Sequence, residues 1–217
     1  SEEYRRQLRE AVAWSEELGE TLASASLATG YNTANSAFSE QLKQVAKLIA
    51  ARGQRQAERD LFFVQYSGFD DHQNVVGSLR WRLADLDKAL RLFVTELRAQ
   101  GVFEQVALVS QSEFGRALAP NSKYGTDHGW AGNHFVLGGG VAGGKVYNRW
   151  PETLLPGNGT DAHHGRLIPE FPWENVMVPI AEWMGMEPSQ AQAVFPNLAN
   201  FEASRHIIPT RTLFPAA

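Results

Sequence analysis

The stretch from Leu61 to His72, LFFVQYSGFDDH, constrains the fold more than any other part of this 217-residue chain. Its first half, through Tyr66, is a run of aromatic and branched residues, a composition typical of a buried strand. A Ser-Gly pair ends the run, and Asp70, Asp71 and His72 follow at once. Open α/β sheets carry their chemistry at the carboxyl ends of strands, so the stretch predicts a strand leading into a functional loop. A solvated turn with polar residues is the alternative interpretation.

The spacing of the polar residues after this run suits a metal site. In extended backbone, residues two apart point the same way, so Asp70 and His72 can converge while Asp71 faces away. The chain has no cysteine, which excludes disulfides and thiolate ligands. A metal would therefore use histidine, carboxylate or hydroxyl ligands, which favours zinc, manganese, calcium or magnesium.

The composition describes a folded chain without an obvious macromolecular partner. Hydrophobic residues make up 43% and charged residues 20%, which argues against disorder. The net charge of −4 gives no reason to expect nucleic acid or an anionic membrane as partner. No apolar run reaches the roughly 18–20 residues of a membrane helix, and no signal peptide is seen. The start at Ser1 favours a processed or truncated product; the oligomeric state is left open.

Hydrophobic periodicity predicts alternating helices and strands within a single α/β domain over residues 1–217. The first part, residues 1–55, reads as a helical region. Helices are expected over residues 3–28, 36–52, 75–100 and 173–184, and strands over 61–66, 106–110 and 134–137. Strand, helix and strand with short connections form a βαβ unit, so the first two strands should be parallel. The expected architecture is a mostly parallel sheet flanked by helices, with residues 117–130 irregular.

This topology would bring polar residues from three loops to one edge of the sheet. They are Asp70, His72, Glu113, Asp127 and His128, and together they predict a metal or hydrolytic site. Arg116 either binds an anionic substrate or pairs with Glu113 and positions it. The other histidines are interpreted as surface residues (His163, His164), as a packed or edge residue (His134) and as a residue without a role (His206).

Adjacent residues in extended backbone point to opposite sides, so Asp127 and His128 should not both bind one metal. We expect His128 to be the ligand. Asp127 would then either orient a metal-binding side chain without contacting the metal, or bind a second metal.

Several segments occur in the same order in the DUF1501 family. They are Gly68–His72, Ser112–Arg116, Gly125–Gly129, the run FVLGGGVAGGKVY and Phe195–Leu198. Over about residues 61–201 the chain resembles the C-terminal part of such a protein. The family groups bacterial proteins of unknown function that are placed with the alkaline phosphatase and sulfatase superfamily.

The resemblance implies an alkaline phosphatase-like core that lacks its N-terminal strands. By the superfamily pattern, Asp70, His72 and His128 bind a first metal, and Glu113 stands where a second-metal acid is expected. Two departures concern these positions: the first pair is D-x-H where the phosphatases use a wider spacing, and Ser112-Glu113 replaces an Asp-His pair. The superfamily's nucleophile and one metal-binding aspartate belong to an N-terminal segment with no counterpart here.

The implied function is metal-dependent hydrolysis of a phosphate or sulfate ester, with a small anionic ester as substrate. The cofactor would be a divalent metal, zinc first, and Arg116 an oxyanion clamp. A periplasmic or exported location is implied, because family members often carry a twin-arginine signal. Without the segment that carries the nucleophile, the chain is expected to hydrolyse little or no ester substrate. The alternative is a non-catalytic binding or scaffold protein with a degenerate site.

Overall fold

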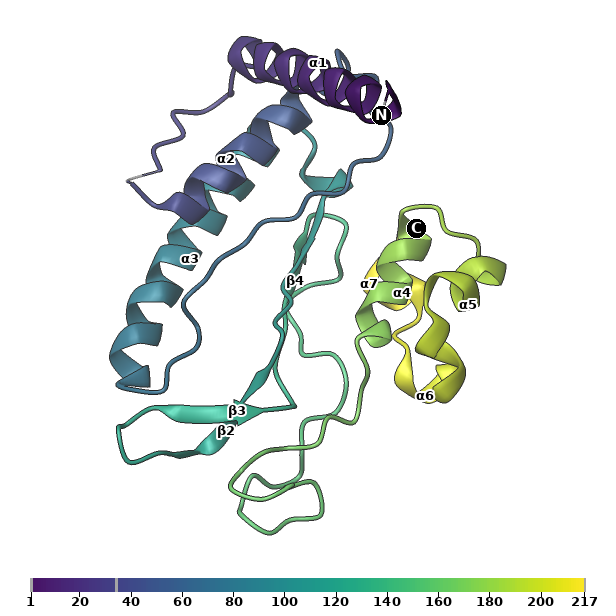
Figure 1. Ribbon diagram of the computed structural model, residues 1–217. Helices are drawn as coiled ribbons and strands as arrows, with labels where there is room; N and C mark the ends of the chain where they lie inside the picture. The colour runs from purple at the N-terminus through teal and green to yellow at the C-terminus, as the bar shows by residue number, and fades with distance from the viewer. Residues whose placement is uncertain (1, 34, 217) are drawn as a thin grey trace. The chain divides into compact units, whose positions relative to one another are not determined.

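The computed structural model describes residues 2–33 and 35–216. The chain divides into two compact units, of which one comprises Ser1–Ser67 and Arg80–Val102 and the other Gly68–Leu79 and Phe103–Ala217. Each unit has its own arrangement of elements (Figure 1). All the candidate site residues named above belong to the second unit.

The first unit is helical, as the sequence predicted. It contains α1 (Glu2–Ser24), α2 (Ala37–Ala50) and most of α3 (Val75–Ala99). Ser36 caps α2, with its side chain accepting from the backbone N–H of Ser39; such caps satisfy an otherwise unpaired donor of the first turn. Helical spacing gathers the buried side chains on one face of each helix. They are Phe38, Leu42, Ala46 and Ile49 on α2, and Ala89, Phe93 and Leu97 on α3.

Helices α2 and α3 run in the same direction (Figure 1). Ser36 Oγ donates to Asp85 Oδ2 at 3.0 Å, and Gln100 Nε2 donates to the carbonyl of Ala46 at 3.1 Å. These bonds join the start of α2 to the middle of α3 and the end of α2 to the end of α3. The chain between the helices must therefore run back along them, and within the first unit residues 57–67 do so without helix or strand.

The strand predicted over residues 61–66 is wrong. The segment is extended, but it has no strand partner among the described residues. The Gln41 side chain takes the place of a neighbouring strand, since its amide donates to the carbonyl of Gln65 (2.9 Å) and accepts from the Gln65 N–H (3.1 Å). Tyr66 stacks on Phe38 with ring centroids 4.6 Å apart. Side chains of α2, rather than a sheet, thus hold this segment in place, and Leu61 and Phe63 stay 88% and 89% exposed.

The mostly parallel sheet flanked by helices is also wrong. Within residues 2–33 and 35–216 the strands form two small antiparallel pairs. Strand β1 (Ala107–Val109), which was expected to lie parallel to residues 61–66, pairs antiparallel with β4 (Val136–Gly138). The short helical turn η1 (Phe103–Gln105) precedes β1. A βαβ unit needs its first strand to join a ladder, and the residues that should have formed it are held by helix side chains instead.

The second pair is a hairpin over residues 115–129, and most of these lie in the stretch 117–130 that was predicted to be irregular. Strand β2 (Gly115–Pro120) pairs with β3 (Thr126–Gly129), and Arg116 lies opposite His128. Asn121 shapes the connection, because its side-chain oxygen accepts from the N–H groups of Lys123 (2.9 Å) and Gly125 (3.0 Å). Asparagine favours such turns because its side chain bonds nearby backbone.

The C-terminal part of the second unit builds its own small core. Helix α4 (Glu174–Trp183) confirms the last predicted helix, and the short helices η2 (Pro188–Gln190), α5 (Ala191–Val194), η3 (Pro196–Asn200), α6 (Ala203–His206) and α7 (Thr210–Leu213) follow. Ile208, Leu213 and Phe214 are buried here, and the ring of Trp183 stacks on Phe214 with centroids 4.8 Å apart. This core holds the C-terminal end of the chain in place, and none of the polar candidate residues belongs to it.

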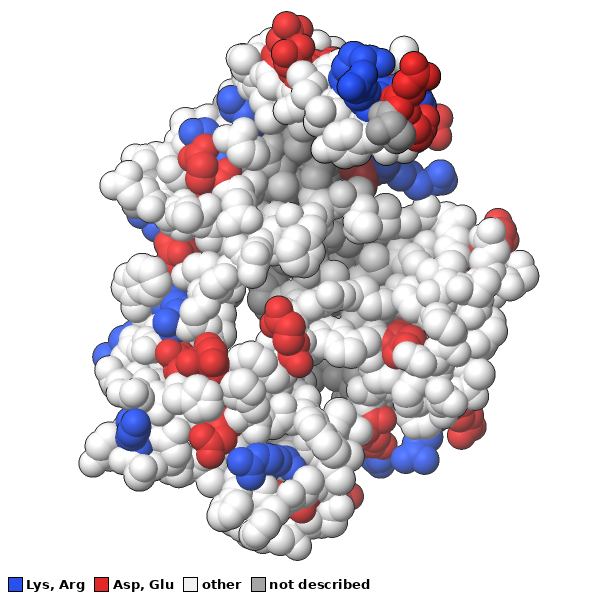
Figure 2. Space-filling view, viewed as in Figure 1, with Lys and Arg blue, Asp and Glu red and all other residues white. Residues whose placement is uncertain are grey.

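Charges of both signs share the visible surface. Figure 2 shows acidic and basic side chains interspersed among neutral ones. On α1, Arg6 pairs with Glu3 at 2.6 Å and with Glu10 at 2.7 Å. Of the helices in the described part of the chain, none combines the length and apolar character that crossing a bilayer requires.

Candidate metal centre

The loop that follows Gly68 is fastened to the β2–β3 connection by backbone hydrogen bonds. Thr126 N–H donates to the carbonyl of Asp71 at 3.1 Å, and Val75 N–H donates to the carbonyl of Tyr124 at 3.0 Å. The Asn121 side chain donates to the carbonyl of His72 at 3.1 Å. These bonds use backbone groups of the loop, so the loop is held against the hairpin independently of its own side chains.

Gly125 makes this close approach feasible. A Cβ built at this position would lie 2.1 Å from the carbonyl carbon of His72 and 2.3 Å from its oxygen. These are backbone atoms, so the clash could not be relieved by a side-chain rotation. Any larger residue at position 125 would push the His72 loop away from the hairpin.

Three of the predicted residues, Asp70, His72 and His128, converge on one point. His72 Nε2 lies 2.9 Å from Asp70 Oδ1, and His128 Nε2 lies 2.8 Å from the same oxygen. The two Nε2 atoms are 3.3 Å apart. The side chains are 48–56% exposed, so one side of the triangle faces solvent. This convergence depends on the hairpin rather than on a parallel sheet edge.

The triangle has dimensions that suit a small divalent ion. Zinc bonds of about 2.0–2.2 Å in a tetrahedral site place neighbouring ligand atoms roughly 3.3–3.6 Å apart. The nitrogen–nitrogen distance of 3.3 Å lies in this range, and the two distances to Asp70 Oδ1 are a few tenths of an ångström shorter. Two imidazoles and one carboxylate, with an open side, form a ligand set common to zinc and other transition metals. The residues fit such an ion.

Asp127 lies behind one of the two imidazoles. Its Oδ1 is 3.5 Å from His72 Nδ1, on the far side of the ring from Asp70. Asn121 Nδ2 lies 3.4 Å from the same oxygen. A carboxylate at the second nitrogen of a metal-binding histidine fixes the ring and its tautomer. Asp127 occupies such a position, although the ring it faces is His72 rather than its chain neighbour His128.

Arg116 donates hydrogen bonds both to the loop after Gly68 and to the hairpin. Its Nη2 donates to Asp70 Oδ1 at 2.8 Å and to the carbonyl of Phe69 at 2.9 Å, and its Nη1 donates to the carbonyl of Thr126. The side chain is 22% exposed, and its Nε is buried without a partner among the described residues. Arg116 therefore ties Asp70 to the hairpin and does not pair with Glu113.

The cationic surroundings of Asp70 keep its carboxylate charged. The hydrogen bond with His128 holds the pKa of Asp70 below its usual value, with smaller contributions from the charge of His72 and from Arg116. A ligand carboxylate has to be ionised to bind a metal. Asp70 meets this condition throughout the neutral range.

Glu113 does not join the group. It is exposed, and within the described part of the chain its side chain lies outside the cluster of Asp70, His72 and His128. Its neighbour Phe114 instead stacks on His128, with ring centroids 4.0 Å apart and planes 5° from parallel. Sequence reasoning missed Phe114, although its place one residue from Glu113 puts it on the opposite side of an extended chain.

Arg166 is the second residue that sequence reasoning missed. Its Nε donates to the backbone carbonyl of His128 at 3.1 Å, and its Nη2 lies 3.7 Å from Asp127 Oδ2. The sequence carries no signal for this placement, because Arg166 follows His163 and His164 in a glycine-containing loop. Those two histidines are exposed and stack on each other.

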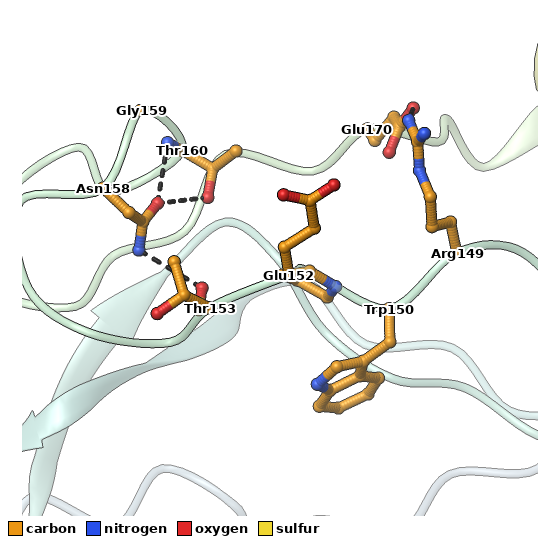
Figure 3. Close-up of a pocket in the computed structure, with 9 residues that line it drawn as sticks. Arg149, Trp150, Glu152, Thr153, Asn158, Gly159, Thr160 and Glu170 are labelled. Atoms are coloured by element: carbon orange, nitrogen blue, oxygen red, sulfur yellow. Dashed lines mark hydrogen bonds and ion pairs between the residues drawn. The ribbon is translucent and has the colours of Figure 1, made fainter.

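A separate hollow of about 280 Å³ lies elsewhere in the second unit (Figure 3). Arg149 and Glu170 form an ion pair of 2.5 Å on one side of it, and Asn158 accepts from Thr160 on the other. The side chain of Glu152 points between them in Figure 3. None of the residues that converge around Asp70 lines this hollow.

The comparisons with known proteins bear on the family alone. Among curated proteins and among solved structures, none matches this chain. The sequence model of DUF1501, described as a protein of unknown function, matches residues 2–163. The match includes the loop after Gly68, the β2–β3 hairpin and helices α1 and α2. Since it covers most of the sequence, this chain belongs to the DUF1501 family.

Proposed function

We propose that Asp70, His72 and His128 bind one divalent metal ion, and that the resulting centre hydrolyses a phosphate or sulfate ester. Zinc is the first candidate, and manganese, calcium and magnesium are the others. The observation that carries the proposal is the triangle of ligand atoms 2.8–3.3 Å apart, with its side chains about half exposed.

The protein's own groups prepare the site for a metal and a substrate. The side chain of Arg116 holds Asp70, and the side chain of Asn121 holds the backbone of His72. Asp127 Oδ1 lies 3.5 Å from His72 Nδ1, on the side of the ring away from Nε2, where a carboxylate can orient a metal-binding histidine. A bound divalent ion would supply a Lewis acid and an activated water. The exposed side of the triangle gives an ester access to that ion.

Hydrolysis of aryl phosphate and aryl sulfate esters, measured with and without added zinc, tests the proposal. We expect slow turnover that requires metal and is lost in His128→Ala. Ser67→Ala should leave it unchanged, because a lone serine without a base is a poor nucleophile. Zinc binding without turnover of either ester would favour the non-catalytic binding or scaffold protein, and absence of zinc binding would contradict the metal centre itself.

A further inference from the structure

Helix α1 carries an apolar stripe that the described part of the chain leaves exposed. Among the residues Glu2–Ser24, all of which the structure describes, only Thr21 is buried. The large apolar side chains that are 43–70% exposed on this helix include Leu8, Val12, Trp14 and Leu18. Single exposed apolar residues are ordinary on a protein surface, whereas a contiguous group of them marks an interaction site.

The helix is attached to the first unit near its C-terminal end. Figure 1 shows α1 lying across the end of α2. Thr21 is buried there, and Lys47 of α2 donates from its Nζ to the carbonyl of Leu22 at 3.0 Å. At 3.6 residues per turn, Thr21 lies about 100° around the helix from the middle of the stripe. The attachment to α2 therefore leaves the stripe open.

The spacing along the stripe is that of a coiled-coil seam. Steps of four and three residues alternate, which keeps a line of side chains facing a partner helix. The residues at these steps are Tyr4, Leu8, Ala11, Ser15, Leu18 and Leu22. The seam is also symmetric, because Leu8 and Leu18 lie equally far from Ala13 along the chain, as Ala11 and Ser15 do. Two antiparallel copies of α1 centred on Ala13 would place leucine against leucine, with small residues between them.

The charges on one flank of the stripe are complementary in the same antiparallel arrangement. Arg5 and Arg9 lie on this flank in the first half of α1, and Glu16 and Glu20 lie on it in the second half. All four side chains are exposed. In an antiparallel pair, Arg9 lies beside Glu16 of the second copy and Arg5 beside its Glu20. A parallel pair would instead set like charges side by side, and flanking charges of this kind decide orientation in helix pairs.

The composition of α1 argues against a membrane surface as its partner. Helices that lie on membranes are rich in lysine and arginine on their polar face. Helix α1 has no lysine, and its six glutamates outnumber its three arginines. Anionic lipid headgroups attract basic segments rather than acidic ones. Charge therefore favours a protein partner, and the symmetry of the seam favours a second copy of this chain.

We infer that α1 is the interface through which two copies of this chain form an antiparallel dimer. Leu8 of each copy packs on Leu18 of the other, and Arg9 of each copy pairs with Glu16 of the other. The same patch of both subunits forms such an interface, as two-fold symmetry requires. It belongs to the first unit and does not depend on the metal centre, whose residues belong to the second.

Sedimentation velocity at micromolar protein concentrations tests the inference. We expect the unmodified protein to be a dimer and Leu8→Glu/Leu18→Glu to be a monomer. The dissociation constant should rise at least about 100-fold, because four leucine side chains per dimer lose their apolar contacts. Glutamate is a good helix former, so α1 should stay helical. Leu83→Glu on α3 is the matched control that should leave the dimer intact, since Leu83 and Leu8 are each 52% exposed.

The chain has no cysteine, so introduced cysteines report the orientation of the two helices. When Leu8→Cys and Leu18→Cys proteins are mixed and oxidised, we expect a disulfide between the two variants. Leu8→Cys alone should not cross-link to itself, because antiparallel packing separates the two copies of this position by about 15 Å along the helix axis. A disulfide cannot span that distance.

Several outcomes would overturn the inference. A protein that is monomeric at micromolar concentrations contradicts it, and so does a dimer that Leu8→Glu/Leu18→Glu leaves unchanged. Efficient cross-linking of Leu8→Cys to itself would show a parallel pair and reject the antiparallel one. A monomer that binds vesicles of phosphatidylcholine and phosphatidylserine, and loses this binding in Leu8→Glu/Leu18→Glu, would assign the stripe to a membrane surface instead.

Discussion

At the scale of single residues, one carboxylate oxygen organises the candidate centre. Asp70 Oδ1 is 2.8–2.9 Å from His72, His128 and Arg116 at once. His72 is only two residues from Asp70, but His128 and Arg116 are distant in the sequence, so their contacts do not follow from local sequence alone. Around this oxygen, ligands and supporting groups should respond differently to mutation.

Substitutions of the neighbours Asp127 and His128 separate the two kinds of residue. We predict that Asp127→Asn weakens zinc binding about 10- to 100-fold, the typical cost of losing a carboxylate behind a metal-binding histidine. His128→Ala removes a ligand and should cost more. Calorimetric titration of zinc ranks the two variants. Asp87→Asn, whose carboxylate pairs with Arg91 on α3, is the control and should bind zinc as the unmodified protein does. Equal and negligible effects at positions 127 and 128 would contradict this ranking.

Glu96 provides a test in the first unit. It is fully buried on α3 and accepts from the backbone N–H groups of Ala28 and Thr29, both at 2.9 Å, and from the side chains of Thr29 and Gln100. Burial raises the pKa of Glu96, but these hydrogen bonds together lower it by more, so the net shift is downward. We predict that Glu96→Gln lowers the free energy of unfolding at pH 7 by about 1–3 kcal/mol, because two of the four donors would face an amide NH2 instead of an oxygen and the other two would lose a charged acceptor.

The same glutamate predicts a pH dependence. Because its folded pKa is below the ordinary value of 4.5, its contribution is complete above pH 4.5. It is lost as the pH falls from there through the lower folded pKa. Urea unfolding at a series of pH values should therefore show the difference between Glu96→Gln and the unmodified protein shrinking below about pH 4.5. A difference that stays constant, or grows on acidification, would be evidence against this role. Glu17→Gln on exposed α1 should change little at any pH.

At the scale of elements, the long amphipathic helices were predictable and the strands were not. Helix α3 (Val75–Ala99) matches the helix predicted over residues 75–100 closely, because helical periodicity is set within the chain. The run at residues 61–66 has the composition of a strand, yet its partners are the side chains of Gln41 and Phe38. Which group pairs with an extended backbone is decided by distant residues, and composition does not report it.

The hairpin that builds the centre was missed for a related reason. Proline, glycine and asparagine within residues 117–130 read as a coil, but they form the tight connection between β2 and β3. Asp70, His72 and His128 nevertheless converge as predicted, but at the hairpin rather than at the sheet edge from which their convergence was argued. Glu113 was chosen by the same reasoning and lies outside the group, since the sheet edge that should have gathered it does not form.

Gly125 offers a test of the element that supports the centre. We predict that Gly125→Ala weakens zinc binding at least about tenfold, because the new Cβ would collide with the backbone of His72 and displace a ligand. Gly159→Ala is the matched control, since a Cβ there meets nothing within 4 Å. Zinc titrations of both variants give the comparison, and equal affinities would show that the hairpin does not position His72.

At the scale of the whole molecule, one unit holds the candidate centre and the other is built from helices. The family match extends across parts of both. The sequence motifs identified the family correctly, whereas the parallel architecture expected from them is not what the chain forms.

The central claim is that Asp70, His72 and His128 bind a metal ion, and zinc stoichiometry tests it most directly. Calorimetric titration of the metal-free protein and of the double variant His72→Ala/His128→Ala gives the number of bound ions, with circular dichroism to show that both are folded. The account predicts one zinc ion per chain in the unmodified protein and none in the double variant. A folded protein that binds no zinc, or a double variant that binds it equally well, would contradict the account.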